Sequence, residues 1–392
     1  MGILWGKIVK FVGCVFWFVC LNYGKYTLNY GKETLIMKKI LFLSVLAAVL
    51  LCACTKKPEQ LYDEQKSGVV MVINKYYYEM KLPSGYTLYF TGLDEDGNIQ
   101  NFTEDVKEVK KNPAVSYGTA FFIDEKGGLL TNRHVASPPI DRDLVKKNFT
   151  AIMSALQQRA GAYMEELRNA YAQAEAEANS IVGYDEYGDL VTTDEERLQE
   201  LVAAAKQMEQ EYEEAQNAVE MLEQIKDPRG IEINPVCELG IALEGSSPKS
   251  ENEFLKRHPC RVVRTAGAQE VDLALLKLTN EVTPSGAYVF NPFEAEDNLA
   301  IGDPLYMIGY NAGVELGYTK KGILSQLTKG AVTQQPDGER VLYDIATVQG
   351  SSGSPVLNAK GELVAVNFAK YARSDNFNLG IPLKAIRAFL RN

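Results

Sequence analysis

Two long stretches of the chain repeat apolar residues at alternating intervals of four and three, and this periodicity strongly constrains the fold. The first stretch runs from Phe149 to Ala174 and the second from Leu198 to Leu222. Such spacing places the apolar side chains along one side of a helix, as in the seam of a coiled coil. The turn-rich segment GYDEYGDLVTT separates the two stretches. We therefore expect residues 141–230 to form an antiparallel helical hairpin, with helices roughly 45 Å long at about 1.5 Å per residue.

A second constraint is the segment DIATVQGSSGSPVLNAKGELVAV, residues 344–366, which crowds small residues between two strand-like runs. An ordinary Gly and Ser loop is one explanation. The other is that Gly350 permits a sharp backbone turn that exposes the hydroxyl of Ser352 as a nucleophile. A serine hydroxyl becomes reactive when a base takes its proton, and that base is most often histidine.

The chain contains only two histidines, His134 and His258. His258 lies in LKRHPCRV, which is typical of a solvated loop. His134 follows two strand-like runs that are joined by an Asp-Glu-Lys-Gly-Gly turn. Asp272 directly precedes an apolar run, and a carboxylate is the group that orients a catalytic imidazole. A structural histidine and an acid at a strand edge remain the alternatives for these two residues.

The order His134, Asp272, Ser352 and the segments around these residues resemble the trypsin-like (chymotrypsin-fold) serine peptidases, and most closely the bacterial HtrA-type (Deg-type) branch. The segments that carry the resemblance are GTAFFIDEKGGLLTNRHV, DLALLKL, GDPLYMIGY, GSSGSP and NFNLGIPLKAIRAFL. They cover roughly residues 114–140 and 231–392. HtrA-type proteins commonly carry PDZ domains after the peptidase, and we expect none here because the chain ends after the closing helix.

The resemblance implies a mainly β fold with two antiparallel six-stranded β-barrels, the active site between them and the helical hairpin inserted. It implies that His134 is the general base, Asp272 its orienting carboxylate and Ser352 the nucleophile. The backbone N–H groups of Gly350 and Ser352 would form the oxyanion hole. Digestive relatives carry an aspartate at the position of Ser351, so activation by cleavage is not expected.

The same alignment places Ala346 at the base of the primary specificity pocket and Thr347 and Asn367 near its walls. None of these residues is charged. We therefore expect small or medium apolar side chains on the acyl side of the cleaved bond.

The segment MKKILFLSVLAAVLLCACTKKPEQ is similar to a bacterial lipoprotein signal. Residues 37–53 would be the signal peptide, Cys54 the lipidated first residue and residues 54–67 a tether. An uncleaved membrane helix is the alternative, but the apolar run is shorter than the ~20 residues that span a bilayer. Residues 1–36 fit neither role, so we expect Met37 to be the start. These features predict a membrane-anchored protein of the bacterial cell envelope that faces the periplasm.

After removal of the signal and lipidation of Cys54, only Cys237 and Cys260 remain. An oxidising compartment favours a disulfide between them, and two buried free thiols are the alternative.

Composition limits the partners. The net charge of −10 argues against nucleic acid as a ligand, and neither a metal-ligand cluster nor a cofactor motif is present in the sequence.

We divide the peptidase domain into residues 68–140 and 231–392. The predicted function is a serine endopeptidase acting on protein or peptide substrates. The alternatives are a catalytically idle scaffold that works through its helical arm and a processing enzyme whose arm selects one partner. The acidic hairpin is the candidate surface for a homo-oligomer or a partner protein.

Overall fold

The computed structural model describes residues 56–224, 230–267, 270–296, 298–370 and 377–391. The chain divides into two compact units, Met1–Lys56 and Lys57–Asn392. The first unit, with the predicted signal peptide and Cys54, lies almost wholly outside the described residues. Among the helices that are described, none combines the length and the apolarity that crossing a membrane requires.

The first sheet closes into an antiparallel barrel of six strands in the order β1-β5-β6-β11-β10-β9, with β9 pairing back onto β1. The strands are β1 (Val69–Lys81), β5 (Ala114–Phe122), β6 (Gly128–Thr131), β9 (Glu232–Ala242), β10 (Pro259–Thr265) and β11 (Ala274–Leu278). The run VVMVI at the start of β1 is apolar and buried, as expected of a strand inside a barrel. The far end of β1 also pairs with β2 (Thr87–Phe90).

The second sheet has six antiparallel strands in the order β15-β12-β17-β18-β19-β16. They are β12 (Pro304–Gly309), β15 (Gln326–Ala331), β16 (Val341–Tyr343), β17 (Pro355–Leu357), β18 (Leu363–Lys370) and β19 (Asn378–Pro382). An isolated bridge between Val332 and Tyr343 joins the two edges of this sheet. The predicted mainly β fold with two six-stranded barrels is confirmed, with the correction that the second barrel lacks a continuous closing ladder.

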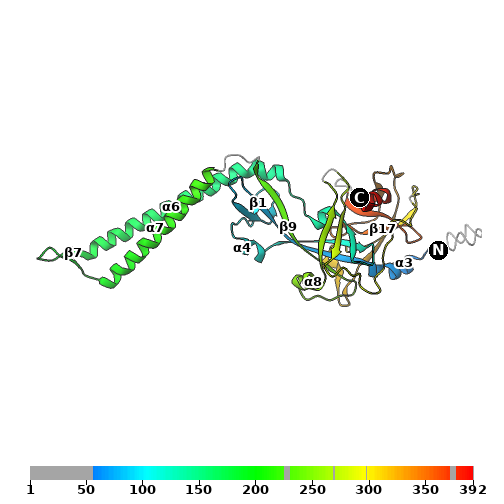
Figure 1. The fold of residues 1–392 in the computed structure, drawn as a ribbon, viewed down its shortest axis with the longest axis horizontal. Helices are drawn as coiled ribbons and strands as arrows, with labels where there is room; N and C mark the ends of the chain where they lie inside the picture. The colour runs from blue at the N-terminus through cyan, green and yellow to red at the C-terminus, as the bar shows by residue number, and fades with distance from the viewer. Residues whose placement is uncertain (1–55, 225–229, 268–269, 297, 371–376, 392) are drawn as a thin grey trace, which may run out of the picture. The chain divides into compact units, whose positions relative to one another are not determined.

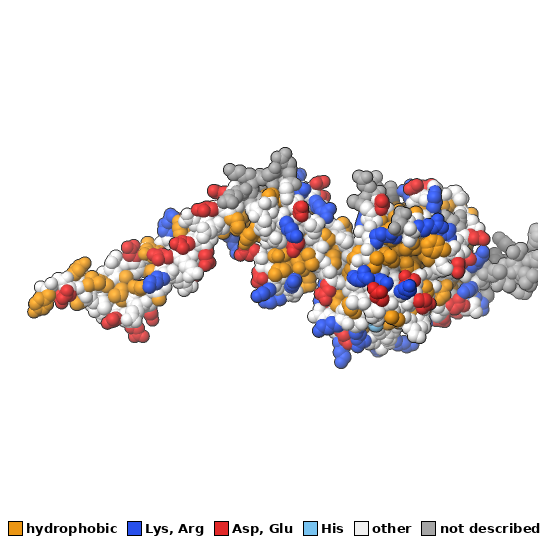
Figure 2. Space-filling view, in the orientation of Figure 1, with side chains coloured by type: hydrophobic (Ala, Val, Ile, Leu, Met, Phe, Trp, Pro, Cys, Tyr) orange, Lys and Arg blue, Asp and Glu red, His pale blue; other side chains and the backbone are white. Residues whose placement is uncertain are grey.

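The inserted helical hairpin consists of α6 (Arg142–Ile181) and α7 (Glu195–Gln224), which lie side by side (Figure 1). The short strands β7 (Val182–Tyr184) and β8 (Leu190–Thr192) form the turn between them. Glu177 forms an ion pair with Arg197 across the two helices. Acidic side chains are spread along the pair, and hydrophobic side chains gather at its tip (Figure 2).

The first turns of α6 belong to the body of the protein. Val145, Phe149 and Met153 are buried in one hydrophobic cluster with residues of β1 and β2, including Tyr78 and Phe90. The hairpin is therefore anchored by apolar packing at its base as well as by its two chain connections.

Residues 58–67 do not form the tether that the sequence suggested. They fold as α3 (Pro58–Gln65) and the 3-10 turn Lys66–Gly68. Leu61 is completely buried, and the Gln65 side-chain amide donates to the Gly361 carbonyl at 2.7 Å. The tether prediction is wrong here because this helix has an apolar side that packs onto the core between the barrels.

The remaining short elements connect these parts. They are β3 (Gly92–Leu93), β4 (Ile99–Gln100), α4 (Val106–Lys111), α5 (Arg133–Ala136), α8 (Glu251–Arg257), α9 (Val314–Gly317), β13 (Tyr318–Thr319), β14 (Gly322–Ile323) and α10 (Leu383–Arg391).

Candidate active site

Strand pairing brings His134 and Asp272 together. Thr131 at the end of β6 lies opposite Ala274 at the start of β11, so the residues after Thr131 meet those before Ala274. The His134 Nδ1 lies 2.5 Å from Asp272 Oδ2, and the His134 backbone N–H donates to Asp272 Oδ1 at 3.1 Å. Asn132, fully buried, donates from its side-chain amide to the Asp272 carbonyl at 2.9 Å. The carboxylate and the imidazole are therefore fixed in one relative orientation.

The electrostatics of Asp272 suit this role. Burial pushes the pKa of its carboxyl upward, but the hydrogen bonds and the charge of His134 outweigh that effect and leave the pKa below its usual value. The ionised carboxylate accepts the Nδ1 proton of the imidazole. The other ring nitrogen, Nε2, then carries a lone pair, as a general base requires.

The short helix α5 holds His134 against the barrel. A Cβ atom at Gly118 of β5 would lie 2.5 Å from the Val135 side chain, so a glycine is needed for this close approach. Asn74 of β1 is fully buried and donates from its side-chain amide to the Val135 carbonyl at 3.0 Å. Asn74 was not predicted from the sequence; its signal is a polar residue at the end of the apolar run of β1.

The loop that carries Ser352 depends on two glycines. Gly350 has φ of 99° and Gly353 has φ of 86°, a region that other residues rarely adopt. A Cβ at Gly350 would lie 2.4 Å from the Tyr310 carbonyl oxygen, and one at Gly353 would lie 2.0 Å from the Thr119 carbonyl oxygen. The glycines therefore allow a turn that packs directly against neighbouring backbone.

Thr119 of β5 ties this loop to the first barrel. Its backbone N–H donates to the Ser352 carbonyl at 2.8 Å, and its hydroxyl donates to the Gly350 carbonyl at 2.9 Å. The Thr131 hydroxyl donates to the Thr119 carbonyl at 2.6 Å, three positions before His134. These bonds hold the Ser352 loop beside the strand that leads to His134. Neither threonine was predicted from the sequence; the signal for each is a hydroxyl at a buried strand position.

The two backbone N–H groups predicted for the oxyanion hole are free within the described part of the chain. The N–H groups of Ser351 and Gly353 donate to Val348 and Asn367 carbonyls. Those of Gly350 and Ser352 have no acceptor among the described residues. Donors left without a partner in an ordered turn are available to an oxyanion.

The third contact of the predicted triad is not made in this structure. Among the described residues, no hydrogen bond joins the His134 imidazole to the Ser352 hydroxyl. Such bonds are often long or poorly aligned without substrate and tighten in the complex. The side chains of His134 and Asp272 are 33% and 19% exposed, so the base can reach a substrate.

Two of the three residues predicted for the specificity pocket have side chains that are already engaged. The Thr347 hydroxyl donates to Asn378 Oδ1 at 2.5 Å. The buried Asn367 amide donates to the Ser351 carbonyl at 3.0 Å, and its oxygen accepts from the Tyr343 hydroxyl at 2.7 Å. Asn367 therefore positions the loop that carries Ser352, while Ala346 is exposed.

The predicted disulfide is not formed. Cys237 and Cys260 are free thiols in the structure. The partner of Cys260 across the β9–β10 ladder is Leu239, which places Cys237 diagonally across the strands. Diagonal neighbours lie about 7–8 Å apart, beyond the usual reach of a disulfide. Burial raises the pKa of Cys237 and raises that of Cys260 to about 12.

Comparison with known proteins finds similarity to peptidases over part of the chain. Residues 243–366, which include Asp272 and Ser352, match the family model of the trypsin-like peptidase domain. The putative serine protease HhoA of Synechocystis is 33% identical to this chain over 127 residues. The match covers 31% of this chain and 31% of that protein. A mitochondrial Do-like protease of Arabidopsis thaliana is 31% identical over 128 residues, or 32% of this chain and 22% of that protein.

A solved serine endoprotease from Yersinia pestis aligns with a TM-score of 0.39 at 13% identity, covering 86% of this chain and 66% of that one. The chain thus matches less than a third of the length of either curated relative. The match to the trypsin-like peptidase model is confined to residues 243–366, and both curated relatives are named as putative proteases.

Proposed function

We propose that this chain is a serine endopeptidase that hydrolyses protein or peptide substrates through an acyl-enzyme on Ser352. The observation that carries the proposal is the doubly hydrogen-bonded pair of His134 and Asp272 beside a glycine-dependent serine loop. A structural histidine needs neither an ionised carboxylate at its Nδ1 nor a neighbouring turn with unused N–H groups.

In the proposed reaction, His134 Nε2 takes the Ser352 hydroxyl proton while the oxygen attacks the substrate carbonyl carbon. Asp272 stabilises the imidazolium that forms. The N–H groups of Gly350 and Ser352 donate to the oxyanion, at about 3 kcal/mol of transition-state stabilisation for each donor. His134 then protonates the leaving amine, and water attacks the acyl-enzyme with His134 again acting as base.

The proposed substrate preference follows from the exposed, uncharged Ala346, which offers no carboxylate to a basic side chain. We expect a small or medium apolar residue on the acyl side of the bond. A panel of peptides that vary at this one position measures the preference. Faster cleavage after Lys or Arg would contradict it.

Labelling with a fluorophosphonate probe tests the catalytic assignment, because this probe reacts with an activated serine. We expect the wild-type chain to be labelled and Ser352→Ala to be neither labelled nor active. Ser354→Ala is the matched control, because the buried Ser354 hydroxyl has no hydrogen-bond partner among the described residues. An unlabelled wild-type chain with an intact fold would favour the idle scaffold instead.

We also propose that the mature chain is a lipoprotein of the bacterial cell envelope, attached through lipidated Cys54 and facing the periplasm. The support is the lysine pair, the apolar run and LCAC within residues 38–54. Several acyl chains anchor a protein stably, whereas one does so only marginally. Cys54→Ser should release the protein from the membrane fraction, and an unmodified Cys54 in membrane-bound protein would refute lipidation.

A further inference from the structure

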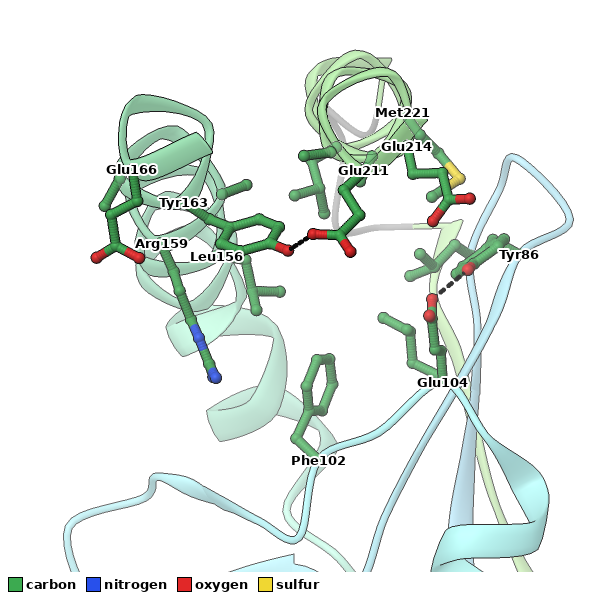
Figure 3. A pocket seen from close by; sticks show the side chains of 17 residues that line it. Tyr86, Phe102, Glu104, Leu156, Arg159, Tyr163, Glu166, Glu211, Glu214 and Met221 are labelled. Carbon is green, nitrogen blue, oxygen red and sulfur yellow. Dashed lines mark hydrogen bonds between the residues drawn. The ribbon is translucent and has the colours of Figure 1, made fainter. Parts of the chain in front are cut away.

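A cavity of about 780 Å³ lies between the base of the helical hairpin and the β2 region of the first barrel (Figure 3). It is separate from the residues assigned to catalysis. One wall comes from α6 and α7, and the other comes from β2 and the segments on either side of it. We call this space the hairpin-base cavity.

The inner surface of the hairpin-base cavity is apolar and aromatic. Leu82, Leu88 and Phe102 line it from the barrel side, and Leu156 and Met221 line it from the helices. The rings of Tyr86 and Tyr163 stand on opposite sides of the space (Figure 3). A surface of this kind accepts aliphatic side chains, and its aromatic faces attract cations.

Carboxylates surround this apolar surface. Glu104, Glu166, Glu211 and Glu214 line the cavity, and Arg159 is the single cation among its lining residues. Within the described part of the chain, none of the four carboxylates forms an ion pair with Lys or Arg. Among the described residues, the lining of the cavity therefore carries more negative than positive charge.

Two of these carboxylates are held in place by tyrosine hydroxyls. Tyr163 donates to Glu211 at 2.5 Å, and Tyr86 donates to Glu104 (Figure 3). The Tyr163 hydroxyl also holds the pKa of Glu211 below its usual value. Each of these carboxylates keeps lone pairs for a further donor.

The charge decides between possible occupants. An anionic ligand would meet four carboxylates. The apolar tip of a second copy, with Tyr184 and Tyr187 strongly exposed, carries Asp185, Glu186 and Asp189 and would also be repelled. A purely apolar ligand would strip water from carboxylates without replacing their hydrogen bonds.

We propose that the hairpin-base cavity binds a polypeptide segment in which apolar side chains alternate with Lys or Arg. The apolar side chains would cover the leucines and Phe102, and the cationic groups would donate to the carboxylates. This binding goes beyond the proposed catalytic function and does not depend on it. In a peptidase it would select substrates or partners that expose basic, apolar stretches.

Direct binding tests the proposal with the full-length Ser352→Ala chain, which cannot consume the probe if Ser352 is the nucleophile. The probe is a fluorescein-labelled dodecapeptide of alternating Leu and Arg, measured by fluorescence anisotropy. One control peptide has Ser in place of Leu, and the other has Glu in place of Arg. We expect saturable binding of the first peptide, weaker binding of the Ser peptide and none of the Glu peptide.

Variants then locate the site. Exposed ion pairs are individually weak, so Glu211→Gln combined with Glu214→Gln should weaken binding about fivefold at low salt. Ala162→Trp places a large ring into the cavity from an exposed helical position and should abolish binding. The matched control combines Glu175→Gln with Glu186→Gln, which removes the same charge from the hairpin outside the cavity, and should leave the affinity unchanged.

Several results would overturn the proposal. Absence of binding to the Leu-Arg peptide would do so, as would equal binding of the Glu peptide. Equal weakening by the control pair would show attraction by the overall charge of the hairpin. A change of mass in solution caused by Ala162→Trp would identify the cavity as a self-association surface instead. Fluorophosphonate labelling reports on Ser352 separately, so this proposal and the catalytic one can fail independently.

Discussion

Replacing Thr119 with valine should lower the stability of the protein and disorder the loop that carries Ser352. The Thr119 hydroxyl is buried, donates to the Gly350 carbonyl at 2.9 Å and accepts from the Tyr310 backbone N–H at 3.0 Å. Valine has nearly the same shape but leaves both backbone groups unpaired. Each unsatisfied buried group costs about 1–3 kcal/mol, so Thr119→Val should lose about 2–6 kcal/mol of unfolding free energy.

Thr119→Ser is the matched control, because it keeps the hydroxyl and removes only a methyl group. Its loss should be about 1 kcal/mol. Urea unfolding compares the stabilities, and peptide cleavage compares kcat and KM. We expect the valine variant to lose kcat more than it raises KM, because the proposed mechanism uses the Gly350 N–H as a donor to the oxyanion. A valine variant as stable and active as the serine variant would refute this account of the loop.

Two further predictions concern buried side chains outside the site. Burial raises the pKa of the Cys260 thiol to about 12, above the unfolded value of about 8.5. The unfolding free energy should therefore keep its full value below pH ~8.5 and fall as the pH rises from there toward about 12. Urea unfolding at several pH values measures this, and an oxidised pair found by intact mass would contradict it. Leu61→Ala should cost about 2–5 kcal/mol because α3 is anchored by this residue, whereas Leu61→Met should cost less than about 1.5 kcal/mol. Equal stability of the two variants would show that α3 does not depend on Leu61.

The sequence predicted the local backbone around the candidate residues well. The glycines around Ser352 and the turn before His134 are short-range signals, and both lie where the resemblance placed them. The strands that deliver His134 and Asp272 are adjacent in the sheet, so a correct topology was enough to bring these two residues together.

The sequence could not predict contacts between distant segments. Leu61 lies in a polar, tether-like stretch, and its burial depends on residues far along the chain. Asn367 lies near the expected pocket by alignment, but its hydrogen bonds turn it toward Ser351. The predicted disulfide between Cys237 and Cys260 is wrong because the strand register places the two residues diagonally. The spacing of cysteines in the sequence does not reveal that register.

The anchored base of the hairpin predicts how much of it can be removed. Excision of residues 141–230 would take away Val145, Phe149 and Met153, each worth about 1.5–3 kcal/mol when fully buried.

The combined loss, about 4.5–9 kcal/mol, approaches the whole stability of a typical protein, so this deletion should unfold the first barrel. Removal of residues 165–209 should be tolerated, because the Tyr163 hydroxyl and the Glu211 carboxylate touch across the two helices and a short Gly-Ser link can join them there. We expect the shorter deletion to keep the unfolding midpoint and the cleavage of a small peptide. Unfolding of both deletions would mean that the distal pair contributes to the core. If both deletion variants stayed folded, the buried cluster of Val145, Phe149 and Met153 would contribute little to the unfolding free energy.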